Sequence, residues 1–273
     1  MNVQWWCAAR SEPWDGSWQA YPGVWIFVIA IAALFWPLRI RDDSSTWRRV
    51  MLPIALMFLW LTLDWPIGPL GAGYLAWIHS IQFLMLAMIV PPVLLLSVDR
   101  ERVRAYLARH AVFQATVARL SQPLFAVIVF AVTMVLTHLP RVVDTLMVSQ
   151  LGAFALDVAW LGAGLLFWWP VVVRLPVRPH FPPLMQMLYL FFGTQPHLYI
   201  AMWLLGADYP SYGTYELAPR ITGVSAIIDQ QIAGALMLGF GATYVIGAIT
   251  VLFFRWMTQQ HGPAWSDGSG GAN

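Results

Sequence analysis

Five of the ionisable side chains that lie inside or at the ends of long apolar stretches are candidate functional residues, because such groups are costly there and by default mark function. They are His79, His138, Asp157, His197 and Asp229. Imidazole nitrogens and carboxylate oxygens bind transition metals, and imidazole suits both copper and zinc. These residue types therefore predict an ion or metal site, and the five residues are its candidate ligands.

Neighbouring residues allow both a functional and a structural interpretation. Met85, Met88 and Met237 lie one or more turns deeper along the same apolar stretches. Thioether sulfur suits cuprous copper, but methionines at helical spacing also pack as ordinary core residues. Asp64 and His138 lie near the ends of apolar stretches, where a polar group can also reach the membrane interface.

The composition indicates which elements position these groups. Of 273 residues, 59% are hydrophobic and 10% are charged, whereas about 25% are charged in an ordinary soluble domain. A membrane-crossing helix needs about 20 apolar residues. The sequence therefore predicts an all-α, polytopic membrane helix bundle with about seven transmembrane helices. The predicted spans are 21–38, 50–70, 74–97, 122–139, 151–173, 183–205 and 225–254.

The arginines predict the orientation, because cytoplasmic loops are enriched in basic residues. Twelve arginines fall after predicted spans one, three, five and seven, and three fall on the opposite side. We therefore expect the N-terminus outside and the C-terminus in the cytoplasm. Residues 99–120 alternate arginines with apolar residues that include Val103, Leu107, Val112 and Phe113. This pattern predicts an amphipathic helix on the inner leaflet, with a solvated loop as the alternative.

In this topology the candidate ligands share the outer half of the membrane. His79, Asp157 and Asp229 lie in the first parts of odd-numbered spans, which run inward. His138 and His197 lie in the later parts of even-numbered spans, which run outward. The sequence therefore predicts a polar cavity that opens to the external face.

The predicted organisation is one membrane domain with short flanks. Residues 1–20 are expected to form an external N-terminal tail, which lacks the pattern of a cleavable signal peptide. Residues 21–258 form the predicted seven-span domain, and residues 259–273 are expected to be a disordered cytoplasmic tail. Cys7 is the only cysteine, which excludes an internal disulfide and any CxxC motif.

Several functional classes do not fit the sequence. It contains no lysine, and a retinal protein needs a lysine for its Schiff base. It shows no nucleophile–base pair, no glycine-rich phosphate loop and no bis-histidine haem pattern. We therefore predict no catalytic residue, no residue that binds an organic cofactor and no enzymatic activity. The small net charge of +2 gives no indication of a nucleic-acid partner.

Five motifs resemble a known family. They are His79-Ser-Ile-Gln82 running into Pro91-Pro-Val-Leu-Leu94, Thr137-His-Leu-Pro140, Leu165-Leu-Phe-Trp-Trp-Pro170, Tyr209-Pro-Ser-Tyr212, and Asp229-Gln-Gln-Ile-Ala-Gly234 followed by Met237. On these residues the chain resembles the seven-span CtaG-type assembly factors associated with caa3-type cytochrome c oxidase. The resemblance covers roughly residues 20–258, and its most specific motif is the one that begins at Asp229.

The resemblance implies a factor in the bacterial inner membrane that helps to mature a haem–copper oxidase at the stage of copper insertion. The implied metal is a copper ion, and the implied partners are oxidase subunits and periplasmic copper chaperones. The chain departs from the family pattern at two positions. Phe83 stands where the family carries a second histidine, and Asp157 stands where its members tend to have a histidine.

Two other functions remain open from the sequence. A structural accessory subunit or scaffold of a respiratory complex would need only interhelical hydrogen bonds, worth about 0.6 kcal/mol each. An ion or proton transporter would use Asp64, Asp157 and Asp229 as titrating carboxylates. The nearly apolar inner half of the predicted bundle disfavours transport, because a transport path needs polar groups on both sides of its site.

Overall fold

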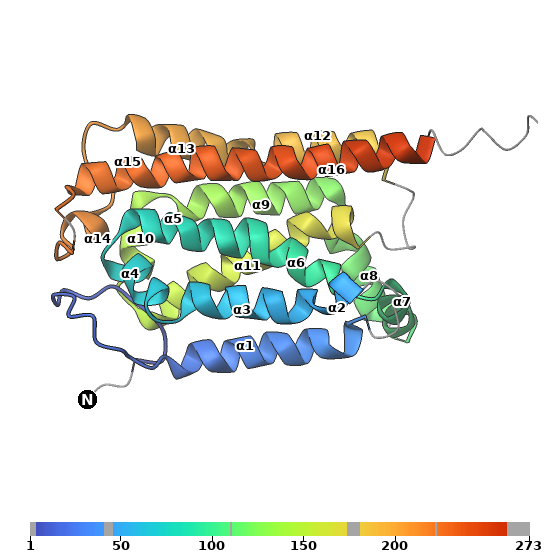
Figure 1. Cartoon of the computed structure of the whole chain (residues 1–273), viewed down its shortest axis with the longest axis horizontal. Coiled ribbons are helices and arrows are strands. Elements are labelled where there is room, and N and C mark those ends of the chain that lie inside the picture. Colours follow the sequence, from blue (N-terminus) through green and yellow to red (C-terminus); the bar gives the residue numbers. More distant parts are fainter. Residues whose placement is uncertain (1–3, 41–45, 110, 174–180, 222, 261–273) are drawn as a thin grey trace, which may run out of the picture.

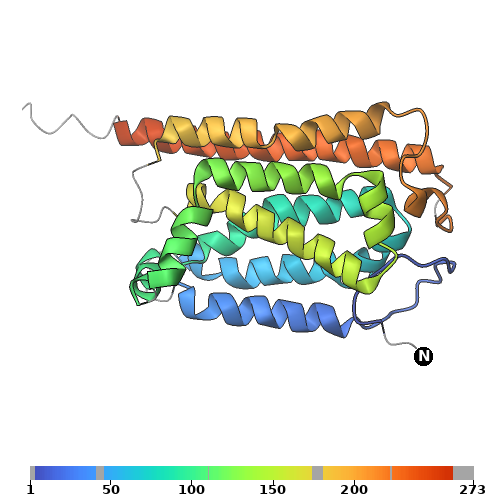
Figure 2. The same ribbon diagram turned by 180° about the vertical axis from the view of Figure 1, so that it is seen from behind.

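The computed structural model describes residues 4–40, 46–109, 111–173, 181–221 and 223–260. Within these ranges the regular structure is helical, apart from one isolated antiparallel bridge between Arg39 and Val98. The long helices run side by side in a bundle, as Figures 1 and 2 show. The all-α class is confirmed. The predicted cytoplasmic tail lies outside the described residues from position 261 onward.

The long helices follow the predicted spans. In chain order they are α1 (Pro22–Phe35) with η1 (Trp36–Leu38), α3 (Met51–Leu63) with α4 (Ile67–Gly73), α5 (Ala76–Leu84) with η2 (Met85–Ile89) and α6 (Val90–Leu96), α9 (Pro123–Thr137), α11 (Gln150–Val172), α12 (Pro183–Gly193) with α13 (Gln195–Gly206), and α15 (Ala226–Leu236) with η3 (Met237–Gly241) and α16 (Ala242–Gln260). The shorter helices are α2 (Thr46–Arg49), α7 (Arg100–Ala108), α8 (Ala111–Leu120), α10 (Pro140–Leu146) and α14 (Gly213–Glu216).

Several helices are long and apolar enough to cross a membrane. Four such stretches are Thr46–Leu63, Ala76–Leu96, Gln150–Val172 and Ala226–Gln260. A fifth is present if Gln114–Leu120 and Pro123–Thr137, which are bent by 66°, count as one span. Pro22–Leu38 is a shorter apolar helix. The described residues thus hold four or five candidate spans by length and composition, and the number seven stays a prediction.

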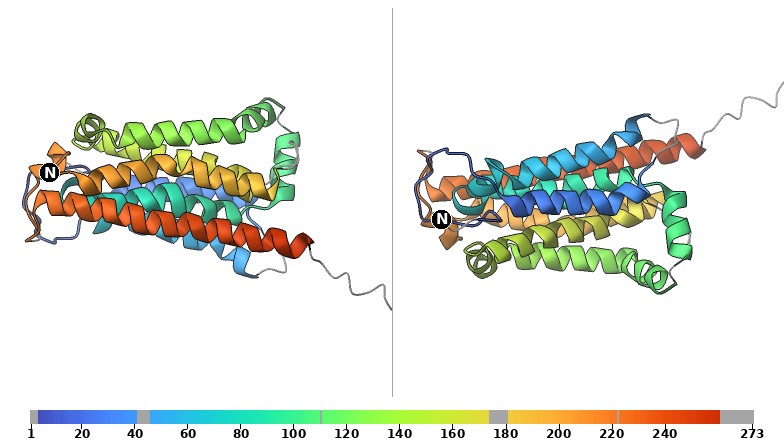
Figure 3. Two further views of the ribbon diagram at one scale, coloured as in Figure 1. Left: turned by 90° about the horizontal axis from the view of Figure 1, so that it is seen from above. Right: turned by 90° about the horizontal axis from the view of Figure 1, so that it is seen from below.

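The short helices divide between the two ends of the bundle (Figure 1). Residues 4–20, α4, α10 and α14 lie at one end, which we call the capped end. Helices α2, α7 and α8 lie at the other, which we call the arginine-rich end. Figure 3 shows α7 and α8 as an arm across that end. Of the apolar residues in the predicted amphipathic segment, Val103 and Leu107 are buried on α7, whereas Val112 on α8 is 84% exposed. The side chain of Phe113 is not among those that the structure describes.

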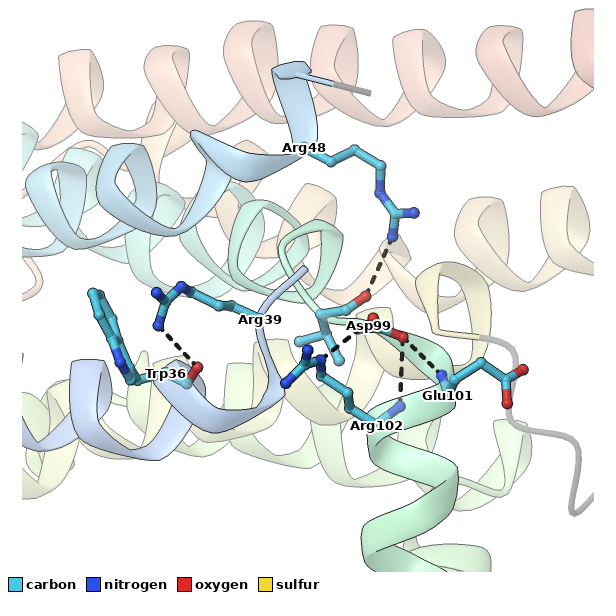
Figure 4. A network of polar contacts seen from close by, with 7 residues as sticks. Trp36, Arg39, Arg48, Asp99, Glu101 and Arg102 are labelled. Carbon is cyan, nitrogen blue, oxygen red and sulfur yellow. Dashed lines mark hydrogen bonds and ion pairs between the residues drawn. The ribbon is translucent and has the colours of Figure 1, made fainter. Parts of the chain in front are cut away.

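A polar network holds η1 against the start of α7 at the arginine-rich end (Figure 4). The Asp99 carboxylate accepts hydrogen bonds from the backbone N–H groups of Glu101 and Arg102, which caps the helix N-terminus. The Arg39 guanidinium lies 3.3 Å from the centre of the Trp36 ring. Backbone hydrogen bonds between residues 38–40 and 97–99 join the two segments.

The N-terminal segment packs into the capped end. Trp6 is 1% exposed, and its indole makes edge-on contacts with Phe27 and Phe154. The Ala9 N–H donates to the carbonyl of Met147 at 2.8 Å. Residues 6–8 of the predicted N-terminal tail are therefore buried against the bundle, whereas residues 11–13 and 15–18 are exposed.

Two of the long helices contain a π-helical turn in the middle. One is η2, between α5 and α6, and the other is η3, between α15 and α16. A π turn widens the helix locally and is often found at functional sites. Helix α11 approaches η2 closely at Gly164, where an added Cβ would lie 2.5 Å from the carbonyl oxygen of Ala87. Only glycine allows these two backbones to come so near.

Candidate functional site

His79 is a buried imidazole without a hydrogen bond. It lies on α5 and is 9% exposed, with the Trp160 ring at 5.0 Å and the Tyr215 ring at 5.6 Å between centroids. Neither ring nitrogen has a hydrogen-bond partner of normal geometry; the nearby Gln82 amide donates to the carbonyl of Thr62 at 3.1 Å instead. Buried polar atoms are nearly always hydrogen-bonded, so the two nitrogens without a partner make His79 the first residue to test as a ligand.

His138 and His197 each have one ring nitrogen committed to the backbone. His138 Nδ1 lies 2.8 Å from the Met134 carbonyl, and His197 Nδ1 lies 2.5 Å from the Thr194 carbonyl. A carbonyl oxygen only accepts, so Nδ1 carries the proton in both rings, and Nε2 of the neutral ring keeps its lone pair. His197 Nε2 is buried without a partner. Metal-binding histidines typically donate their second N–H in this way.

Aromatic side chains contact the histidines on several sides. The Phe83 ring is 4.8 Å from the His138 ring and 5.5 Å from the Trp160 ring. Trp160 in turn contacts both His79 and His138, and its indole N–H donates to the Thr137 hydroxyl at 2.9 Å. The chain thus places an aromatic ring directly against His138, at the position where the family pattern has a histidine.

The aspartates among the candidate ligands hold other parts of the fold. Asp157 accepts a hydrogen bond from the Trp6 indole at 2.8 Å. Asp229 accepts from the backbone N–H groups of Ala76 and Trp77 at 2.9 and 3.1 Å. Asp229 lies on α15 and thus caps the N-terminus of α5. The dipole of α5 favours a negative charge at that end of the helix. Both carboxylates therefore have a structural role in this conformation.

The five candidate ligands do not converge on one point. Across the described residues, no group of three or more histidine, cysteine, aspartate or glutamate side chains is placed to hold a metal ion. Two cavities at the capped end, of 220 and 410 Å³, are lined by none of the five. His79 and His197 carry ring nitrogens without a partner, whereas the carboxylates of Asp157 and Asp229 accept hydrogen bonds. The assignment of a metal site stays a prediction.

Cys7 is not an available thiolate. Its thiol is buried and donates to the carbonyl of Leu63 at 3.3 Å. Burial, and then the charges of Asp157 and Asp64, raise the pKa of this thiol well above its usual value. The thiolate is the metal-binding form of cysteine, and burial together with the hydrogen bond to Leu63 favours the thiol form instead.

The loop between α13 and α15 covers the histidine region, which the sequence did not predict. The Tyr215 hydroxyl donates to the carbonyl of Gly71 at 2.7 Å, and the Tyr212 hydroxyl donates to the carbonyl of His138 at 2.9 Å. Asp144 on α10 holds the same loop by accepting from the backbone N–H groups of Gly213 and Thr214. The tyrosines of the Tyr209-Pro-Ser-Tyr212 motif and of α14 are the residues in the sequence from which this cover could have been predicted.

The fold and this region define the class of protein: an α-helical membrane protein with buried histidine and aromatic side chains toward one end of its bundle. The family model described as cytochrome c oxidase caa3 assembly factor matches residues 16–259. The chain belongs to this family, and the resemblance seen in the motifs is confirmed. No curated protein and no solved structure matches it. A role in oxidase assembly, and association with the oxidase, follow from the family.

Proposed function

We propose that this protein presents copper to a haem–copper cytochrome c oxidase, or relays it, from the outer face of the bacterial inner membrane. The observation that carries the proposal is His79, a buried imidazole with two unpartnered ring nitrogens. His138 and His197 support it, because each holds Nε2 in the form that binds a metal. Copper is the cargo of this site, and no catalytic step is assigned to the protein.

The available donors suit transfer rather than storage. Thiolate and thioether ligands favour cuprous copper, and imidazole is a harder donor that also binds it. With the Cys7 thiol buried and bonded to Leu63, the imidazole groups are the proposed donors. A site of this kind binds the ion without trapping it, which a donor to another protein requires.

A scaffold function is the second candidate, and the carboxylates favour it. Asp64 and Asp157 each accept an indole N–H from another segment, Trp25 and Trp6 respectively. Asp229 joins α15 to α5. If these contacts were the whole purpose of the polar groups, the bundle alone would support oxidase assembly and no copper would bind.

Metal analysis of the purified protein separates these two functions. We expect the intact chain to bind cuprous copper. His79→Ala should lower its affinity at least about tenfold, since even the loss of a group that only supports a ligand typically has an effect of this size. His110→Ala is the matched control, because it removes an imidazole that follows α7 in the sequence. Equal copper binding by the intact protein and His79→Ala would favour the scaffold.

We also propose seven spans with the N-terminus outside, because the arginine-rich segments gather at one end of the bundle. A reporter that fluoresces only in the cytoplasm, fused to the C-terminus, is expected to be active, and a periplasmic phosphatase fused there is expected to be inactive. One additional span inserted before each reporter should exchange the two results. Phosphatase activity without the added span would show the reverse orientation.

A further inference from the structure

A cavity at the arginine-rich end is separate from the histidine region. Its volume is 480 Å³, within the range of about 300–1,000 Å³ that small-molecule sites occupy. The walls come from the end of α1 with η1, from α7 and α8, and from the second half of α11. Phe35, Val103, Leu107 and Leu165 are among the lining residues. The space is therefore shaped by segments that are distant in sequence, and its surface is almost entirely apolar.

The lining offers an occupant almost no hydrogen-bonding group. Trp169 lines the cavity, but its indole Nε1 is itself buried and does not reach the cavity surface. A predominantly apolar lining of this size suits a hydrocarbon chain rather than a polar ligand.

The chain around the cavity carries an excess of positive charge. Residues 97–121 contain five arginines, against the two carboxylates of Asp99 and Glu101. Arg104 is exposed and follows the lining residue Val103 in the sequence. Arg119 is also exposed and precedes the lining residue Leu120. Asp99 pairs with Arg102 at 3.6 Å and caps α7, so it leaves these two arginines in excess. Basic segments next to a membrane helix attract anionic lipid headgroups.

We propose that this cavity binds one acyl chain of an anionic phospholipid, whose phosphate lies among the arginines of α7 and α8. Chain and headgroup are recognised by different parts of the same site: the apolar wall takes the hydrocarbon, and the arm across the end of the bundle supplies the charge. The site is independent of the copper proposal, because it shares no residue with the histidine region.

Gly162 allows the acyl-chain part to be tested. It lines the cavity, and a Cβ added there would meet no atom within 4 Å, so Gly162→Leu fills the space without a clash at its first carbon. Gly247→Leu on α16 is the matched control, since its Cβ also meets nothing within 4 Å and it lies outside the cavity lining.

The probe is the full chain reconstituted into nanodiscs of equal parts phosphatidylglycerol and phosphatidylethanolamine, then released and examined by native mass spectrometry. We expect the intact protein to retain phosphatidylglycerol at least about fivefold more than phosphatidylethanolamine. Gly162→Leu should lower the retained phosphatidylglycerol by a similar factor, and Gly247→Leu should leave it unchanged. Unchanged retention in Gly162→Leu would overturn the site.

The headgroup part is tested by Arg104→Gln with Arg119→Gln, two exposed positions whose replacement leaves the packed core intact. We expect this double variant to keep a bound lipid but to lose the preference for phosphatidylglycerol. An intact protein that retains both lipids equally, or a double variant that keeps the full preference, would overturn the assignment of an anionic lipid.

Discussion

A strain that carries His79→Ala together with His138→Ala is expected to assemble a cytochrome c oxidase with at least about tenfold less copper. The two changes remove the unpartnered imidazole and the ring whose Nε2 is held in the metal-binding form. No imidazole then remains beside Trp160, so copper delivery should fail while the helices persist. The measurement is the ratio of copper to haem in the purified oxidase, together with its oxygen consumption.

Two comparisons make this result specific. The variant protein should still be found in the membrane by immunoblot, because both substitutions replace side chains and leave the helical backbone bonding intact. External copper should partly restore the single variant His79→Ala, since delivery rather than oxidase folding is impaired. Full copper occupancy of the oxidase in the double variant would contradict the relay, and the scaffold function would replace it.

Asp229→Ala is expected to lower the thermal unfolding midpoint strongly. Asp229 is 1% exposed, and its carboxylate is the acceptor for the backbone N–H groups of Ala76 and Trp77 at the start of α5. A buried group that loses its partner costs about 1–3 kcal/mol. With two such groups, the free energy of unfolding should fall by about 2–6 kcal/mol, as measured on the purified protein in detergent.

Asp229→Asn separates capping from metal binding. Its amide oxygen can still accept from one N–H group, so the loss of stability should be about half that of the alanine variant. Copper binding should be nearly unchanged if the carboxylate only caps α5. A large loss of copper by Asp229→Asn at normal stability would instead identify Asp229 as a ligand. An unchanged midpoint in Asp229→Ala would contradict the capping role.

The helical class could be predicted because it depends on local composition. Long apolar stretches with few charges specify helices wherever they fold, and the observed helices follow the predicted segments closely. Their breaks were less predictable. The π turn at Met85–Ile89 precedes Pro91 and Pro92, which interrupt helical hydrogen bonding, whereas the π turn at Met237–Gly241 contains no proline. The second turn contains Gly239 and Gly241, which weaken a helix but do not by themselves specify a π turn.

The partners of the candidate ligands could not be predicted, because they lie far away along the chain. The sequence shows that Asp229 is a carboxylate in an apolar span, but its partners are the N–H groups of residues about 150 positions earlier. Trp6 was assigned to a tail, although its pairing with Asp157 places it in the core. The histidines were recognised by type alone, and only the structure shows which of their nitrogens are unused.

The contact between Trp6 and Asp157 also constrains the order in which the protein is made. The two residues are 151 positions apart, so the segment that leaves the ribosome first has no partner until α11 has been synthesised. The same holds for the start of α5, which waits for Asp229, 153 positions after Ala76. The capped end is therefore completed only after translation has reached the last helices. In a nascent chain that is arrested earlier, the first residues lack these packing and hydrogen-bond partners.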